Sequence, residues 1–80
     1  MARQMGDLKT KFGKRLRILR QRKGMTQEQL AEAADISVDF LSLVERGVNA
    51  PSFATLERIA NALGVSEKEL FEFSDSQGDI

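Results

Sequence analysis

Residues 26–47 read TQEQLAEAADISVDFLSLVERG and carry the clearest structural signal in the chain. The pattern Thr26-x-x-Gln29 is a capping box, in which two side chains satisfy backbone N–H groups at the start of a helix. A second helix is predicted from Ser37, a typical N-cap residue, to the residue before Gly47, a typical helix stop. The segment therefore predicts two short helices joined by a tight turn.

The turn between these helices falls at Asp35 and Ile36. A bend this sharp requires a positive φ at Asp35, which glycine adopts easily and aspartate adopts at some energetic cost. Leu30, Ala31 and Ala34 are expected to face inward from the first helix. Because Ala31 is small, we expect the two helices to cross closely.

The second helix has two faces on a helical wheel. The face assigned to the core carries Ser37, Phe40, Leu41 and Val44. The opposite face carries Val38, Asp39, Ser42, Leu43 and Arg46. Most side chains on this outer face are compact, so the helix backbone could approach a duplex closely in a groove about 12 Å wide. Every amphipathic helix has an outward face, but the preceding helix, the tight turn and the following stop favour a role in recognition.

Three further helices are predicted, which makes the fold all-α. The first spans about residues 7–23 and ends before Gly24. The second begins near Ser52 and ends at Gly64. The third begins with the capping box Ser66-x-x-Glu69. The apolar face of the first of these helices is predicted to consist of Leu8, Phe12, Leu16 and Leu19. That of the second is predicted to consist of Phe53, Leu56, Ile59, Ala60 and Leu63.

Composition narrows the classes of function. Eighty residues make one domain, expected over 7–73 with mobile tails at 1–6 and 74–80. Cysteine and histidine are both absent, so disulfides, thiolate metal sites and histidine catalysis are excluded. No apolar run approaches the roughly 20 residues of a membrane span. Because the N-terminus lacks the apolar core of a signal peptide, we expect a cytoplasmic protein without membrane contact.

The formal net charge of zero hides a strong polarity. Residues 1–24 carry nine Lys and Arg against one Asp, whereas residues 25–80 carry three against eleven Asp and Glu. One end can attract phosphate while the other repels it, which would orient the chain on a polyanion. The alternative is that both are ordinary solvated helix faces.

Taken together, these patterns resemble the Cro/phage-repressor family of helix-turn-helix regulators, also called the xenobiotic-response-element family. The resemblance covers roughly residues 8–73 and implies a compact five-helix, lambda-repressor-like domain that binds operator DNA, with no enzymatic activity and no cofactor or metal. The matching pieces are Phe12-Gly13-x-x-Leu16-x-x-Leu19-Arg20, Gly24-Met25-Thr26-Gln27-Glu28-Gln29-Leu30-Ala31, Ile36-Ser37-x-x-Phe40-Leu41-Ser42-x-Val44-Glu45-Arg46-Gly47 and Pro51-Ser52-x-x-Thr55-Leu56-x-x-Ile59-Ala60-x-Ala62-Leu63-Gly64-Val65.

The resemblance also implies which residues contact DNA. Gln27 would contact a phosphate and buttress the recognition helix, Val38 and Asp39 would face bases, and Arg46 and Asn49 would meet the backbone. The full set is Thr26, Gln27, Ser37, Val38, Asp39, Ser42, Leu43, Arg46 and Asn49.

The chain departs from the family pattern at the reading positions. Val38 can recognise only a thymine methyl group, by apolar contact. Asp39 can accept a hydrogen bond from the amino group of cytosine but repels phosphate, and Leu43 offers no hydrogen bond. Glycine is usual where this chain has Asp35. We therefore expect sparse base readout, with DNA shape and backbone contacts supplying more of the specificity.

Two structural contacts are implied as well. Arg20 and Glu45 are expected to form a partly buried ion pair that joins the first helix to the recognition helix. Leu70, Phe71 and Phe73 supply more apolar side chains than one short helix needs, so they are the predicted homodimer surface. The alternative is that all three complete the core of the monomer.

Two classes of function follow. The first is a transcriptional regulator that binds a palindromic operator as a homodimer, in the manner of phage repressors or restriction–modification controller proteins. As an activator, such a regulator would contact RNA polymerase through an acidic patch. The second is a protein-interaction module, such as an antitoxin or adaptor, with a toxin-like protein as partner. An enzyme is disfavoured because Glu67, Glu69 and Glu72 lie on a helix surface without a pocket-forming loop.

Overall fold

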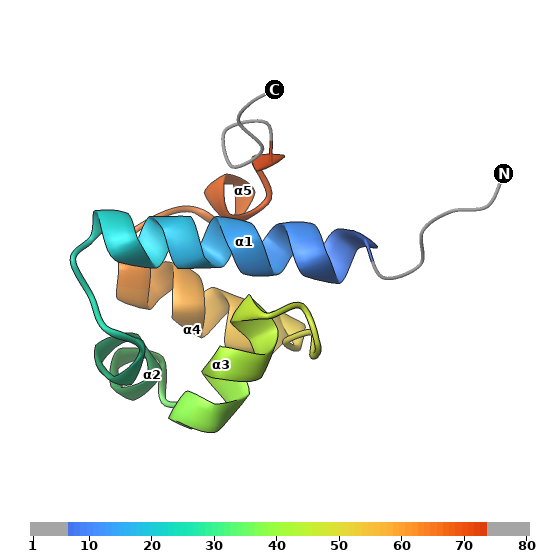
Figure 1. Ribbon diagram of the computed structural model, residues 1–80. Helices are drawn as coiled ribbons and strands as arrows, with labels where there is room; N and C mark the ends of the chain where they lie inside the picture. The colour runs from blue at the N-terminus through green and yellow to red at the C-terminus, as the bar shows by residue number, and fades with distance from the viewer. Residues whose placement is uncertain (1–6, 74–80) are drawn as a thin grey trace, which may run out of the picture.

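A computed structural model describes residues 7–73, which contain five α-helices and no strand. In Figure 1, α1 crosses the molecule between α5 on one side and the α2–α3 pair on the other, with α4 behind. The predicted all-α, five-helix class is confirmed, while the tails predicted at 1–6 and 74–80 lie outside the described residues. The helices are α1 (Asp7–Arg22), α2 (Gln27–Ala34), α3 (Val38–Glu45), α4 (Phe53–Leu63) and α5 (Glu67–Leu70).

The helix starts follow the predicted capping residues. At α2, the Gln29 amide donates to the Thr26 hydroxyl at 3.0 Å, and the Thr26 amide donates to the Gln29 side chain at 2.9 Å. The side chains of Ser37, Ser52 and Ser66 accept a hydrogen bond from the third residue of α3, α4 and α5 in the same way. Each cap satisfies an N–H group that a helix leaves without an internal partner. The local sequence thus fixes where four of the five helices begin.

The core draws on all five helices. Its fully buried large side chains are Leu16, Leu30, Leu41, Val44, Ile59, Leu63 and Leu70. Removing apolar surface from water is the main favourable term in folding, so this shared core holds the helices in place.

Two residues predicted on core faces are exposed instead. Leu8 is 56% exposed because it lies in the first turn of α1, which extends past α3 (Figure 1). Phe53 is 86% exposed. It is the first residue of α4 and lies about 80° from the centre of that helix's apolar stripe at 100° per residue. These two corrections leave large apolar side chains on the surface.

A close contact joins α1 to the end of α3. A Cβ atom at Gly13 would lie 2.5 Å from the Val44 carbonyl oxygen and 2.6 Å from that of Glu45, so only glycine fits there. Nearby, the Arg20 guanidinium donates through Nε to Glu45 Oε2 at 2.6 Å and through Nη2 to Glu45 Oε1 at 3.0 Å. Both side chains are buried, so the predicted ion pair between the two helices is confirmed.

We predict that Arg20→Ala lowers the free energy of unfolding by about 3 kcal/mol or more, because it leaves the Glu45 carboxylate buried without its partner. The measurement is urea denaturation followed by circular dichroism. The matched control is Lys14→Ala, an exposed position on the same helix, which should change stability by less than about 0.5 kcal/mol. Equal stability of both variants would show that the ion pair does not hold α1 to α3.

Candidate nucleic-acid interface

The turn between α2 and α3 has the predicted left-handed residue. Asp35 has φ 59° and ψ 48°, and the Ile36 amide donates to the Ala31 carbonyl at 3.0 Å. Arg58 of α4 supports the turn from outside the motif, because its Nε donates to the Ala34 carbonyl at 2.8 Å. The angle between α2 and α3 is therefore set by their own turn and by α4.

The inner face of α3 differs in part from the prediction. Leu41 and Val44 are buried, as expected, but Phe40 is only half-buried and Ser37 is exposed. Ser37 lies one residue before the helix, where its hydroxyl accepts from the Phe40 amide, so it caps the helix and does not enter the core.

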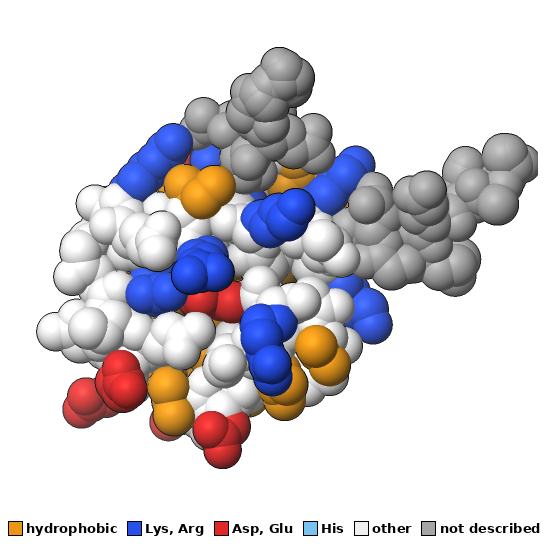
Figure 2. Space-filling view, viewed as in Figure 1, with side chains coloured by type: hydrophobic (Ala, Val, Ile, Leu, Met, Phe, Trp, Pro, Cys, Tyr) orange, Lys and Arg blue, Asp and Glu red, His pale blue; other side chains and the backbone are white. Residues whose placement is uncertain are grey.

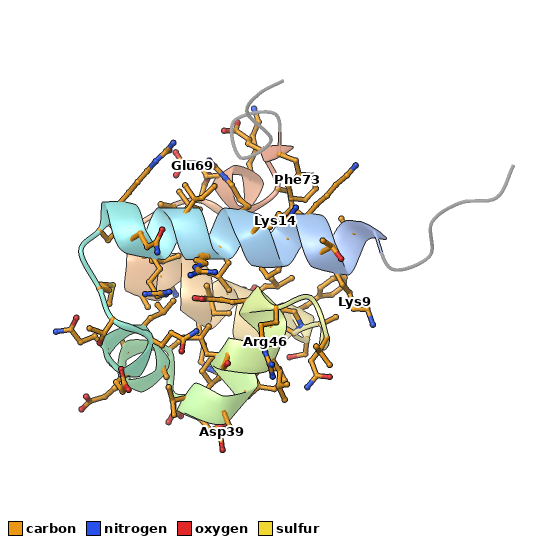
Figure 3. All side chains as sticks on the ribbon, viewed as in Figure 1. Lys9, Lys14, Asp39, Arg46, Glu69 and Phe73 are labelled. Carbon is orange, nitrogen blue, oxygen red and sulfur yellow. The ribbon has the colours of Figure 1, made fainter. Side chains whose placement is uncertain are left out.

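The outer face of α3 is partly exposed. Asp39 and Arg46 are exposed, whereas Ser42 and Leu43 are half-buried. Val38 is also half-buried and packs against the core, which shortens its reach into solvent. In Figure 3, Asp39 lies at the far end of the molecule from α5, and Arg46 lies at the other end of α3. The helix therefore presents an acidic tip and a basic C-terminal end.

A groove of about 470 Å³ lies between α1, α2 and the outer face of α3. It brings together four of the predicted DNA-contacting residues, while the remaining five lie outside it. The groove is lined by Arg17, Arg20, Thr26, Gln27, Glu28, Ser42, Glu45 and Arg46.

Gln27 is held in this groove by the carboxylate that pairs with α1. Its Nε2 donates to Glu45 Oε1 at 3.0 Å, so the side chain braces α2 against α3. An amide nitrogen carries two N–H groups, which leaves a second donor for a ligand.

The groove has a positive balance. Arg20 offsets the charge of Glu45, and the exposed Arg17 and Arg46 at its walls outnumber the one remaining acidic residue, Glu28. Figure 2 shows Lys and Arg side chains surrounding a small acidic patch on this face. Sequence analysis missed Arg17. Its position three residues before Arg20 places both on one face of α1, which is the signal that could have identified it.

The residues predicted to form a dimer surface divide into two kinds. Leu70 is fully buried within the chain, so it has no surface to offer a partner and this part of the prediction is wrong. Phe71 is 40% exposed and packs on Phe12, with ring centroids 5.2 Å apart. Phe73 is half-buried and lies edge-on to Phe71. Much of the expected surface thus completes the core.

Asn49 is joined to the end of α3, because its backbone amide donates to the Leu43 carbonyl at 3.4 Å. It follows α3 in the chain, is half-buried, and lines a second groove near the start of α1.

Among residues 7–73, no group of three acidic side chains is placed to hold a metal ion. No helix in this range is long and apolar enough to cross a membrane.

Comparison with known proteins identifies this architecture. The protein-family model described as a helix-turn-helix domain matches residues 11–73. The chain belongs to this helix-turn-helix family. It is 42% identical over 69 residues to the HTH-type transcriptional regulator DdrOP3 of Deinococcus deserti, covering 86% of this chain and 54% of that protein. The chain thus spans about half the length of that relative.

Shorter family members match along most of their length. The uncharacterized HTH-type transcriptional regulator YazB of Bacillus subtilis is 44% identical over 59 residues, covering 74% of this chain and 86% of that protein. The crystal structure of the restriction–modification controller protein C.AhdI from Aeromonas hydrophila is 40% identical, with a TM-score of 0.77 over 79% of this chain and 96% of the other. The resemblance to Cro-type regulators inferred from sequence motifs is confirmed.

The positive φ at Asp35 strains the backbone of a residue that has a Cβ atom. Replacing Asp35 with glycine should raise the free energy of unfolding by about 0.5 kcal/mol, because relief of the Cβ clash exceeds the added backbone entropy of the unfolded chain. The control is Glu32→Gly on the exposed face of α2, which should lower stability by about 0.5 kcal/mol. A loss of stability at both positions would mean that Asp35 makes a favourable contact that glycine removes.

Proposed function

We propose that this protein is a sequence-specific DNA-binding transcriptional regulator that inserts α3 into the major groove. The observation that carries the proposal is the outer face of α3, exposed at Asp39 and Arg46, beside a groove with exposed arginines. An α-helix fits the major groove, and flanking cations neutralise phosphates, so the two features together suit a duplex. The membership of the family supports the same conclusion.

The phosphate contacts would come from the groove between α1, α2 and α3. Arg17 and Arg46 supply charge on opposite walls, and the free N–H of Gln27 supplies a directed donor. Thr26 caps the N-terminus of α2, where the positive end of the helix dipole also favours an anion. These contacts would fix the register of α3 on the DNA without reading sequence.

Base reading would fall mainly to Asp39 and Ser42. Aspartate accepts a hydrogen bond from the amino group of cytosine, and serine suits several base edges. Val38 and Leu43 would add apolar contact only. Ser37 would reach the DNA backbone or a base edge, and Asn49 would contact a phosphate at the edge of the interface. With few hydrogen-bonding groups on α3, DNA shape should contribute strongly to specificity.

A homodimer on an inverted repeat completes the proposal. One recognition helix reads only a few base pairs, so specific affinity usually comes from a two-fold dimer that spans half-sites about one helical turn apart. Phage-type repression and restriction–modification control are both compatible with this geometry.

A second candidate is a protein-interaction module of the antitoxin or adaptor kind. The observation that favours it is the acidic and apolar character of the reading positions, with Asp39 at the tip of α3 and Leu43 on its outer face. A toxin-like protein would then be the partner, whereas RNA polymerase would be the partner of a DNA-binding activator. Salt dependence separates the two, because phosphate contacts make affinity fall steeply with salt whereas capping of a protein need not.

We predict different effects of two substitutions on DNA binding. Gln27→Ala should weaken binding to all sequences to a similar extent, because it removes a backbone contact. Asp39→Ala should change the base preferred at one position, with a discrimination loss of about 1–3 kcal/mol. Competition binding against a panel of single-base operator variants measures both. An unaltered preference in Asp39→Ala would show that this residue does not read a base.

Arg17 provides a test of the electrostatic half of the proposal. Arg17→Ala should reduce affinity on every sequence and lower the slope of log affinity against log salt by about one. The matched control is Lys68→Ala on α5, an exposed cation outside the groove, which should leave the slope unchanged. If the two variants had equal salt slopes, the groove would not hold a phosphate.

A further inference from the structure

The C-terminal end of α2 receives its charged partner from another helix. Ala34 is the last residue of α2, and the last turn of α2 contains no basic residue. The Asp35 and Ile36 amides both donate to the Ala31 carbonyl, which lies one turn earlier in the helix. These bonds leave the Ala34 carbonyl, at the negative end of the helix dipole, to another donor.

Arg58 of α4 supplies that donor. Its Nε donates to the Ala34 carbonyl at 2.8 Å, and its Nη2 makes a longer contact of 3.4 Å with the Thr55 hydroxyl. Thr55 is buried, and its amide donates to the hydroxyl of the helix cap Ser52 at 3.1 Å. Because a guanidinium is planar and its donors point in fixed directions, contacts on two nitrogens set its orientation. The end of α2 is thus held to α4 by one oriented side chain.

This contact matters because the turn that follows it is strained. Asp35 comes directly after Ala34 and has φ 59°, a conformation that costs free energy for a residue with a Cβ atom. Glycine would adopt the same φ without this cost. With aspartate, the turn depends more on contacts from outside, and Arg58 provides such a contact at the adjacent residue.

The two ends of α3 are held by different contacts. Glu45, the last residue of α3, accepts from Arg20 and Gln27, which joins this end to α1 and α2. The other end, which carries Asp39, follows the turn that Arg58 supports. A helix of eight residues is about 12 Å long, so a tilt of about 5° around its C-terminal end moves its N-terminal tip by about 1 Å. A shift of that size breaks a hydrogen bond to a base, because donor–acceptor distances span only about 0.5 Å.

We propose that Arg58 is a positioning residue for sequence recognition, which sets the base preference at Asp39 without touching DNA. The inference rests on the proposed function, which makes Asp39 a base reader. Arg58 does not line the groove that supplies the proposed phosphate contacts, and α4 lies behind the α2–α3 pair in Figure 1. Loss of Arg58 should therefore change which base is preferred and leave the electrostatic attraction to the duplex nearly unchanged.

The first test is competition binding of single-base operator variants by the unmodified chain and by Arg58→Met. Methionine keeps an unbranched apolar stem but cannot donate to the Ala34 carbonyl. Discrimination at the base that Asp39 reads should fall about five- to ten-fold, while the slope of log affinity against log salt stays the same. A slope lowered by about one would identify Arg58 as a direct phosphate contact and overturn the inference.

Two further variants serve as controls. Arg58→Lys keeps the charge and a donor, so it should recover most of the lost discrimination. Discrimination no better than that of Arg58→Met would overturn the role of the Ala34 contact. Glu57→Ala, at the neighbouring exposed position of α4, should leave the base preference unchanged. Loss of stability does not mimic the expected result, because a partly unfolded variant loses affinity for every sequence by the same factor.

A double variant shows whether Arg58 acts through Asp39. In the Asp39→Ala background, Arg58→Met should change the preference at that base by less than about two-fold, because the side chain that it positions is gone. An undiminished effect of Arg58→Met in this background would overturn the inference.

Amide hydrogen exchange of the DNA-free chain separates this inference from the proposed function. The Ile36 amide bridges the turn, whereas the Val48 amide donates to the Leu43 carbonyl at 2.9 Å at the other end of α3. Arg58→Met should raise the ratio of the Ile36 to the Val48 exchange rate about ten-fold, and an unchanged ratio would overturn the positioning role.

The two readouts together distinguish the failures. A chain that discriminates bases equally well with and without Arg58 would overturn the inference and leave the proposed function intact. A chain with no base preference, in which Arg58→Met still raises the exchange ratio, would contradict the regulator and limit Arg58 to support of the turn.

Discussion

The contact between α1 and α3 controls how the recognition helix is presented. Glu45 is buried and accepts two hydrogen bonds from Arg20 and one from Gln27, so a single carboxylate joins α1, α2 and α3. A buried charge without partners is costly, which makes any other arrangement of these helices unfavourable. Gly13 permits the approach, because any side chain there would collide with the carbonyls at the end of α3. With its inner face held this way, α3 turns Asp39, Ser42 and Arg46 outward.

Much of the fold follows from local rules. The caps at Thr26 and Ser37, the positive φ at Asp35 and the inward face of α2 were all predictable, because each depends on residues within one turn of each other. The Arg20–Glu45 pair was predicted from a family resemblance, since no local pattern links residues 25 positions apart.

The errors share a physical cause. Periodicity shows which face of a helix is apolar, but it does not show whether a neighbour covers the end of that face. Leu8 and Phe53 were therefore predicted to be core residues, although both lie in first turns that the rest of the described chain leaves largely exposed. The reverse happened at Leu70, which was assigned to a surface and is buried. Arg17 was missed because its role depends on a groove formed by three helices.

The role of α3 is tested most directly by in-vitro selection, in which the purified chain binds random duplex DNA. A salt concentration of about 150 mM suppresses purely electrostatic binding. A sequence-specific regulator should enrich an inverted repeat whose half-sites are centred about one helical turn apart. Recovery of unenriched sequence by folded protein would contradict DNA recognition by α3 and favour a protein partner for the same surface.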